Sequence, residues 1–81
     1  MKEDRFWATC KKIEDAEGGG VKFHFAERYH TDGAEGSIIS LRYGVNLGEE
    51  VGVFFTEKDL KKKGKTRAFL AKYLYSKVCQ N

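Results

Sequence analysis

The sequence contains no proline, only two cysteines and no long apolar run. Without proline, isomerisation of an X–Pro bond cannot limit the rate of folding. No apolar stretch approaches the length of about 18 residues that a membrane-spanning helix needs, and residues 1–5 are too charged for a signal peptide. Cys10 and Cys79 show no CxxC spacing. We therefore expect two reduced thiols in a cytoplasmic protein without a membrane partner.

Catalytic and metal-binding patterns are also missing. Gly64-Lys65-Thr66 resembles the end of a phosphate-binding loop, but the glycine that this motif needs five residues earlier is replaced by Asp59. Cys10, His24 and His30 have no fourth partner for a zinc site. No nucleophile is paired with a base in the sequence pattern. We expect a protein that is not an enzyme and holds neither a metal nor a cofactor.

The charge of the chain is unevenly distributed. Residues 56–81 contain eight basic and two acidic side chains, whereas residues 1–55 contain seven basic and ten acidic ones. A cationic segment on a mildly acidic body is typical of a surface that meets a polyanion, and nucleic acid is the commonest polyanion in a cell. The basic segment therefore indicates that this protein contacts a polyanion, most commonly nucleic acid.

Alternating apolar residues predict strands over residues 21–29, 37–45 and 51–55, with a turn at Thr31-Asp32-Gly33. Thr56 and Asp59 resemble a helix cap and predict a short helical turn after it. Thr66 is a second candidate cap, and a longer helix is predicted from there to Cys79. The apolar residues at helical spacing, which we expect to cover the sheet, are Phe69, Leu70, Tyr73, Leu74 and Val78.

The N-terminal segment fits two structures. Phe6, Ala8 and Cys10 alternate as in a strand, and Phe6, Cys10 and Ile13 recur as in a helix. The acidic residues after Ile13 would oppose the dipole at a helix C-terminus, which favours a strand over residues 6–13. We predict a single α+β domain over residues 1–81, with sheet mainly in 1–55 and a basic helical segment in 56–81. The predicted order is β-β-β-β-α, and the alternative is α-β-β-β-α.

Each order resembles a known type of nucleic-acid-binding module. Four strands and a helix are similar to the sheet-plus-helix modules of single-strand-binding transcriptional coactivators and purine-rich-element-binding proteins. The alternative order is similar to double-stranded-RNA-binding domains, and Lys61-Lys62-x-Gly64-Lys65-x-x-Ala68 resembles the Lys-Lys-x-Ala-Lys-x-x-Ala opening of their second helix. Gly64 departs from that pattern, and Phe69-Leu70 stands where small residues are usual, so no family is assigned.

Basic and aromatic side chains are the candidate contacts for nucleic acid. Basic side chains contact phosphates, and exposed rings stack on unpaired bases. The aromatic candidates are Trp7, Tyr29 and Tyr43, whose polar groups favour a wet surface. The basic candidates are Lys58, Lys61, Lys62, Lys63, Lys65, Arg67, Lys72, Arg28 and Arg42.

Two functions follow from these patterns. The first is a small non-enzymatic nucleic-acid-binding protein that contacts phosphates, of DNA or RNA, through its basic C-terminal segment. The alternative is a small protein of the kind found in phages and mobile elements, which binds a host protein partner and inhibits or modulates it. Phosphate binding should weaken steeply with salt, whereas an aromatic protein interface should not. An exposed edge strand over residues 51–55 would also allow a homodimer.

Overall fold

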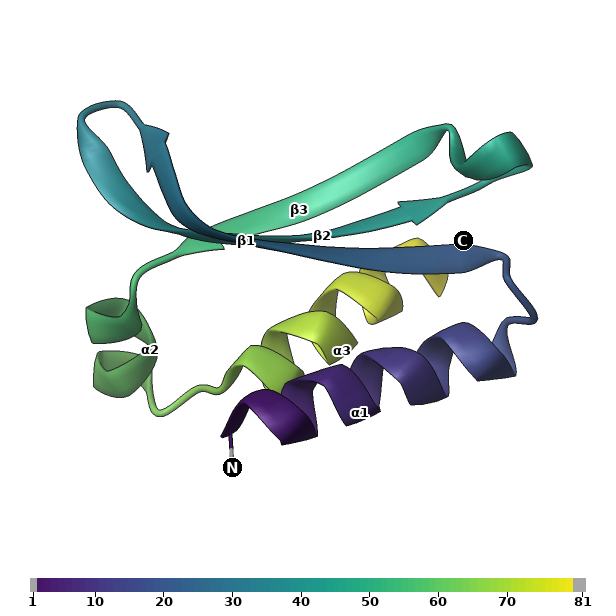
Figure 1. Cartoon of the computed structure of the whole chain (residues 1–81), viewed down its shortest axis with the longest axis horizontal. Coiled ribbons are helices and arrows are strands. Elements are labelled where there is room, and N and C mark those ends of the chain that lie inside the picture. The colour runs from purple at the N-terminus through teal and green to yellow at the C-terminus, as the bar shows by residue number, and fades with distance from the viewer. Residues whose placement is uncertain (1, 80–81) are drawn as a thin grey trace.

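The computed structural model describes residues 2–79, with side chains from Arg5 onward. The elements are α1 (Lys2–Ala16), β1 (Val21–Thr31), β2 (Ala34–Tyr43), the short 3-10 helix η1 (Val45–Leu47), β3 (Glu49–Phe55), α2 (Glu57–Lys63) and α3 (Arg67–Cys79). The strands form an antiparallel sheet in the order β1-β2-β3, and α1 and α3 lie side by side against one face (Figure 1). The predicted α+β class is confirmed. None of the helices described is long and apolar enough to cross a membrane.

The first helix corrects the four-strand prediction. Residues 6–13 lie within α1, so the sheet has three strands and the chain begins with a helix. Phe6 and Cys10 are each 1% exposed, and Ile13 packs against the same core. Their spacing puts all three on one side of a helix, whereas a strand would have turned Ile13 to the other face. The segment is helical because a helix buries Phe6, Cys10 and Ile13 on one side, which a strand could not do.

Two contacts of acidic side chains offset the unfavourable dipole at the end of α1. The carboxylate of Glu14 accepts a hydrogen bond from the backbone N–H of Phe23 at 2.8 Å. Asp15 pairs with Lys11 one turn earlier, at 3.8 Å. An exposed charge at a helix end costs only a few tenths of a kcal/mol to about 1 kcal/mol, so these contacts are sufficient to permit the helix.

The sheet buries one face and leaves the other open. Alternation along β1 and β2 turns Phe23, Ile39 and Leu41 towards the helices, where each is at most 4% exposed. Asp32 and Gly33, with φ of +49° and +77°, form the two-residue turn that joins these strands. The strand and turn predictions for this hairpin are therefore confirmed, although both strands extend further towards the turn and β2 ends at Tyr43, two residues before the predicted end.

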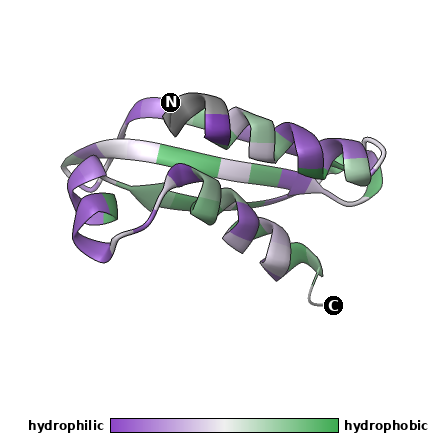
Figure 2. Cartoon of the chain, turned by 90° about the horizontal axis from the view of Figure 1, so that it is seen from below, coloured by the Kyte–Doolittle hydropathy of each residue, from purple (hydrophilic) through white to green (hydrophobic). Residues whose placement is uncertain are grey.

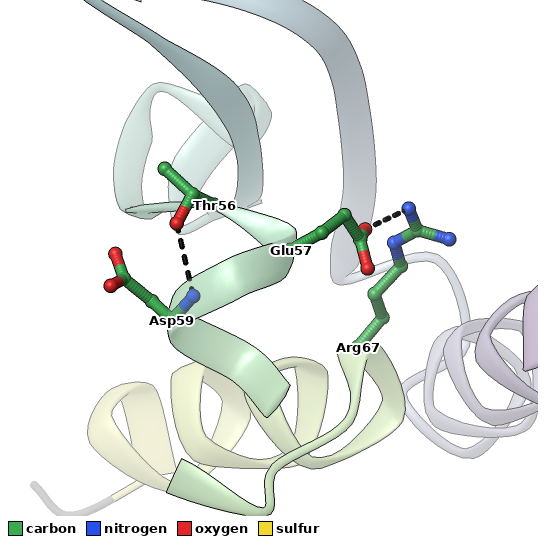
Figure 3. A network of polar contacts seen from close by, with 4 residues as sticks. All are labelled: Thr56, Glu57, Asp59 and Arg67. Carbon is green, nitrogen blue, oxygen red and sulfur yellow. Dashed lines mark hydrogen bonds and ion pairs between the residues drawn. The ribbon is translucent and has the colours of Figure 1, made fainter. Parts of the chain in front are cut away.

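The connection between α2 and α3 follows the predicted caps. The hydroxyl of Thr56 accepts a hydrogen bond from the backbone N–H of Asp59 at 3.0 Å (Figure 3). Gly64, with φ of +64°, ends α2 in the left-handed conformation that favours glycine. The hydroxyl of Thr66 then accepts from the N–H of Phe69 at 3.1 Å. The chain is thereby capped on both sides of a sharp reversal.

The buried side of α3 differs from the predicted one. Its buried residues are Ala68, Ala71 and Leu74, whereas Phe69 and Tyr73 are 44% and 43% exposed. The small alanine side chains face α1 and the sheet, so α3 packs close to both. Leu74 is buried as expected, but the prediction that Phe69 and Tyr73 belong to the covering face is wrong.

The two cysteines are both free in the structure. Cys10 is buried on α1, and its burial, with a smaller contribution from Glu14, raises the pKa of the thiol to about 12. The Cys10 thiol therefore stays protonated at neutral pH. Cys79 is exposed at the end of α3.

Two glycines of the sheet provide a matched test of the packing. A Cβ at Gly36 would lie 2.5 Å from the carbonyl oxygen of Phe55 and 2.7 Å from the Phe54 ring, whereas at Gly52 its nearest neighbour is 3.4 Å away. We expect Gly36→Ala to lower the free energy of unfolding by about 1–3 kcal/mol through overpacking. Gly52→Ala should stay within about 1 kcal/mol of wild type. Urea denaturation followed by circular dichroism measures both, and equal stabilities would contradict this packing.

Candidate nucleic-acid interface

A cavity of about 690 Å³ lies at the end of the molecule where α1, α2 and α3 meet. Leu60 and Ala68, at 7% and 8% exposure, give it an apolar floor. Among the residues whose side chains the structure describes, the lining contains five cations and one carboxylate. The lining residues are Arg5, Glu57, Lys58, Leu60, Lys61, Lys65, Thr66, Arg67 and Ala68.

Three elements bring these cations together. Lys58 and Lys61 lie three residues apart on α2 and so share one side of that helix. Lys65 follows the reversal at Gly64, and Arg5 comes from the first turns of α1. Figure 1 shows that α1 and α3 begin at this same end and run in the same direction. In Figure 2, α2 is mostly coloured as hydrophilic. The cavity is therefore a meeting point of basic side chains from separate elements.

Arg67 has partners within the protein. Its guanidinium pairs with the carboxylate of Glu57, as Figure 3 shows, and its side chain is 17% exposed. The guanidinium carbon lies 5.1 Å from the ring centroid of Phe25, a cation–π contact. Arg67 thus connects α3 to α2 and to β1. The same pair balances the charge of Glu57, so that Arg5, Lys58, Lys61 and Lys65 determine the sign of the cavity.

The other predicted basic residues lie outside this cavity. Lys62 and Lys63 are exposed on α2, and Lys72 is exposed on α3. Arg28 occupies a bulge in β1 with φ of +56° and lines a neighbouring cavity of about 290 Å³, which shares Glu57 and Arg67 with the first. Arg42 pairs with Glu50 at 3.6 Å. Glu50, the residue opposite Arg42, lies five residues before the end of β3. This puts it about 17 Å from the connection between β3 and α2.

The three predicted stacking residues lie on three different surfaces. Trp7 is on α1, is 49% exposed and packs edge-on against Phe6. Tyr29 is on the open face of the sheet, with its ring 6.3 Å from that of Phe54. Tyr43 is half-buried and packs against the core on the covered face. These rings therefore do not form one common stacking surface.

The structure exposes two aromatic residues that the helical spacing had placed on the side of α3 that covers the sheet. Phe69 and Tyr73 project from α3, and each ring has an ammonium group close to it. The Lys65 nitrogen lies 4.0 Å from the Phe69 centroid, and the Lys77 nitrogen lies 5.1 Å from the Tyr73 centroid. Two small residues three positions apart, Ala68 and Ala71, were the signal for a different buried side.

The histidines and Cys10 lie in different environments. Cys10 is buried beneath the sheet, whereas His24 is exposed and His30 lies 3.2 Å from Glu35. Among the residues that the structure describes, no group of three or more His, Cys, Asp or Glu is placed to hold a metal ion.

No protein-family model, curated protein or solved structure matches this chain. The order of helix, three strands and helix is the one that resembles double-stranded-RNA-binding domains, with α2 added before the last helix. Order alone identifies no family. The function is therefore inferred from the charge, exposure and placement of the side chains.

The role of Arg67 in holding the cavity together is testable by stability. Arg67→Met removes the pair with Glu57 and the cation–π interaction with Phe25, and should lower the free energy of unfolding by about 1–2 kcal/mol. Lys62→Met is the control, because Lys62 is exposed and should change stability by no more than about 0.5 kcal/mol. Equal urea midpoints for the two variants would show that Arg67 does not connect the elements.

Proposed function

We propose that this protein is a non-enzymatic nucleic-acid-binding protein that contacts phosphates through the cavity at the junction of α1, α2 and α3. The observation that supports this most strongly is the convergence of Arg5, Lys58, Lys61 and Lys65 on one cavity. Among the side chains that the structure describes, the one carboxylate in the lining belongs to Glu57 and is paired with Arg67. A bound phosphate group would be surrounded by cations.

Solubility and helix stability explain only part of this arrangement. Lys61, Lys62 and Lys63 occupy the last turn of α2, where the dipole favours positive charge. Lys58 lies near the start of α2, where the dipole opposes it, and Arg5 comes from another helix. Like charges that converge raise the free energy of the unbound protein, and an anion relieves that repulsion. Dispersed lysines would have provided solubility without this cost.

The cavity also offers neutral donors and an apolar surface. Thr66 lines it at the start of α3, where backbone N–H groups point outwards and favour anions. Leu60 and Ala68 provide the apolar floor. The phosphate of a nucleotide matches the N–H groups, and its sugar and base match the apolar floor. Phosphate contacts of this kind position a nucleic acid without reading its sequence.

A second candidate function is favoured by the open face of the sheet. Tyr29, Ile38 and Phe54 line a cavity of about 570 Å³ there, on the side that the helices do not cover. Thr31, Ser40 and Glu50 also line it, and aromatic rings beside polar side chains are typical of a protein–protein interface. Binding to a host protein, as phage and mobile-element inhibitors do, would use this face. Such binding should persist at salt concentrations that weaken phosphate contacts.

The proposed function predicts which lysines matter. Lys58, Lys61 and Lys65 line the cavity, so changing all three to Gln should weaken binding to a labelled oligonucleotide by about tenfold or more at low salt. The slope of log affinity against log salt should also become shallower, by about 0.7–0.9 for each phosphate that the variant no longer neutralises. Fluorescence anisotropy at about 50 and 200 mM salt measures both quantities.

The matched control removes the same charge elsewhere. Lys11, Lys12 and Lys22 are exposed lysines on α1 and β1, outside the cavity lining. Changing these three to Gln should alter affinity by less than about threefold, because only diffuse electrostatic attraction is reduced. Equal losses of affinity in the two triple variants would mean that net charge, and no particular site, attracts the nucleic acid. Full affinity in the cavity variant would overturn the proposal.

A further inference from the structure

A line of cations and rings follows the exposed side of α3. Phe69, Tyr73 and Lys77 are spaced four residues apart on α3 and so are neighbours along the helix, whereas Lys65 lies in the connection just before it. We call these four residues the α3 stripe. Each ring has an ammonium group within 5.1 Å of its centroid. Lys65 belongs both to the stripe and to the lining of the cationic cavity. The stripe therefore continues that cavity along α3.

The two rings of the stripe are not required by the core. Leu70, Tyr75 and Val78 of α3 pack against the hydrophobic cluster, but Phe69 and Tyr73 are absent from that set. They remain 44% and 43% exposed. Two large exposed rings therefore lie on adjacent turns of one helix, each with an ammonium group close to it.

The charge around the rings selects the kind of partner. Residues 67–79 contain no acidic side chain, and Lys72 adds a further exposed cation beside the stripe. A second copy of this chain would bring the same cations to the same place and would be repelled. Single-stranded nucleic acid has both of the matching groups, because its phosphates are anionic and its unpaired bases have faces that stack on aromatic rings.

We propose that the α3 stripe binds single-stranded nucleic acid, with bases stacked on Phe69 and Tyr73 and phosphates on Lys65, Lys72 and Lys77. This inference rests on the proposed function and extends it by naming the strand form. Four residues of α3 separate the ring-bearing positions by about 6 Å along the helix axis, so each ring can receive its own base. In a duplex the base faces are already stacked on each other and are inaccessible to these rings.

The test compares an intact oligonucleotide with one that has no bases. The probes are a labelled oligothymidylate of about 12 nucleotides, an abasic strand of the same length, and a duplex. The double variant Phe69→Leu, Tyr73→Leu keeps apolar, helix-favouring residues. It should bind oligothymidylate about tenfold or more weakly than wild type. Its affinity for the abasic strand and for the duplex should be unchanged within about twofold, because phosphate contacts remain.

A matched variant tests the other aromatic surface. Phe54→Leu removes a ring from the open face of the sheet and should leave binding to oligothymidylate unchanged. A loss of affinity with Phe54→Leu but not with the double variant would overturn the proposal and assign stacking to the sheet. Tighter binding to the duplex than to the single strand would also overturn it. So would a loss of affinity that is equal for the intact and the abasic strand.

Failure of the stripe can be distinguished from failure of the proposed function. If the triple cavity variant loses affinity and the double ring variant does not, phosphate binding is supported and the stacking role is wrong. If wild-type protein binds none of the three probes at low salt, the proposed function itself is wrong. Photo-cross-linking of wild-type protein to 5-bromodeoxyuridine strands needs no variant. It should label the peptide that carries Phe69 and Tyr73, and labelling confined to other peptides would contradict the proposal.

Binding to an anionic membrane surface is the other outcome that the experiment separates. Vesicles of phosphatidylserine present negative charge and an apolar layer. If the protein bound these vesicles and lost that binding in the double variant, while showing no preference for oligothymidylate over the abasic strand, the stripe would be a lipid site and the nucleic-acid assignment would be overturned.

Discussion

The orientation of α3 about its own axis is the constraint on which the functional surface depends. This helix has more apolar side chains than one side can bury. Ala68, Ala71 and Leu74 take the buried side, and the two alanines allow α3 to approach α1 and the sheet closely. Burying the small residues leaves Phe69 and Tyr73 outside. Packing of the interior thereby determines which rings are exposed at the surface.

The reversal between α2 and α3 determines where the charge collects. Gly64 ends α2 in a left-handed conformation, and Thr66 caps the helix that follows. Arg67 holds the two helices together through Glu57 and extends over Phe25 of β1. Most of the predicted basic segment is exposed, but Arg67 has this internal role. The same segment thus provides both the structural connection and the exposed cations.

Much of the fold was predictable because its signals are local. The alternation in β1 and β2, the Asp32-Gly33 turn and the two threonine caps all depend on residues that are close in sequence. The N-terminal helix was only the alternative prediction, because its acidic end is stabilised by a contact with another element, the backbone N–H of Phe23. A partner that is distant in the sequence leaves no periodic signal.

The candidate site was predictable only in its charge. The lysines of α2 stand out in the sequence, whereas the contribution of Arg5 depends on how α1 packs beside α3. The exposure of Phe69 likewise depends on which side of α3 is buried. Exposed rings were expected at Tyr29 and Tyr43 because their polar groups favour a wet surface, yet the core covers part of Tyr43. A surface that is assembled from several elements can be identified only from the tertiary structure.

An NMR titration of the isotopically labelled protein with a short single-stranded oligonucleotide would show whether the cavity and the α3 stripe bind nucleic acid. We predict that the largest amide shifts occur in residues 57–77 and near Arg5, around the cavity and along α3. Small shifts are expected for residues such as Lys22 and Ile38 on the open face of the sheet. If the largest shifts occurred on that open face, or if none occurred at low salt, the cavity and the α3 stripe would not be the nucleic-acid site.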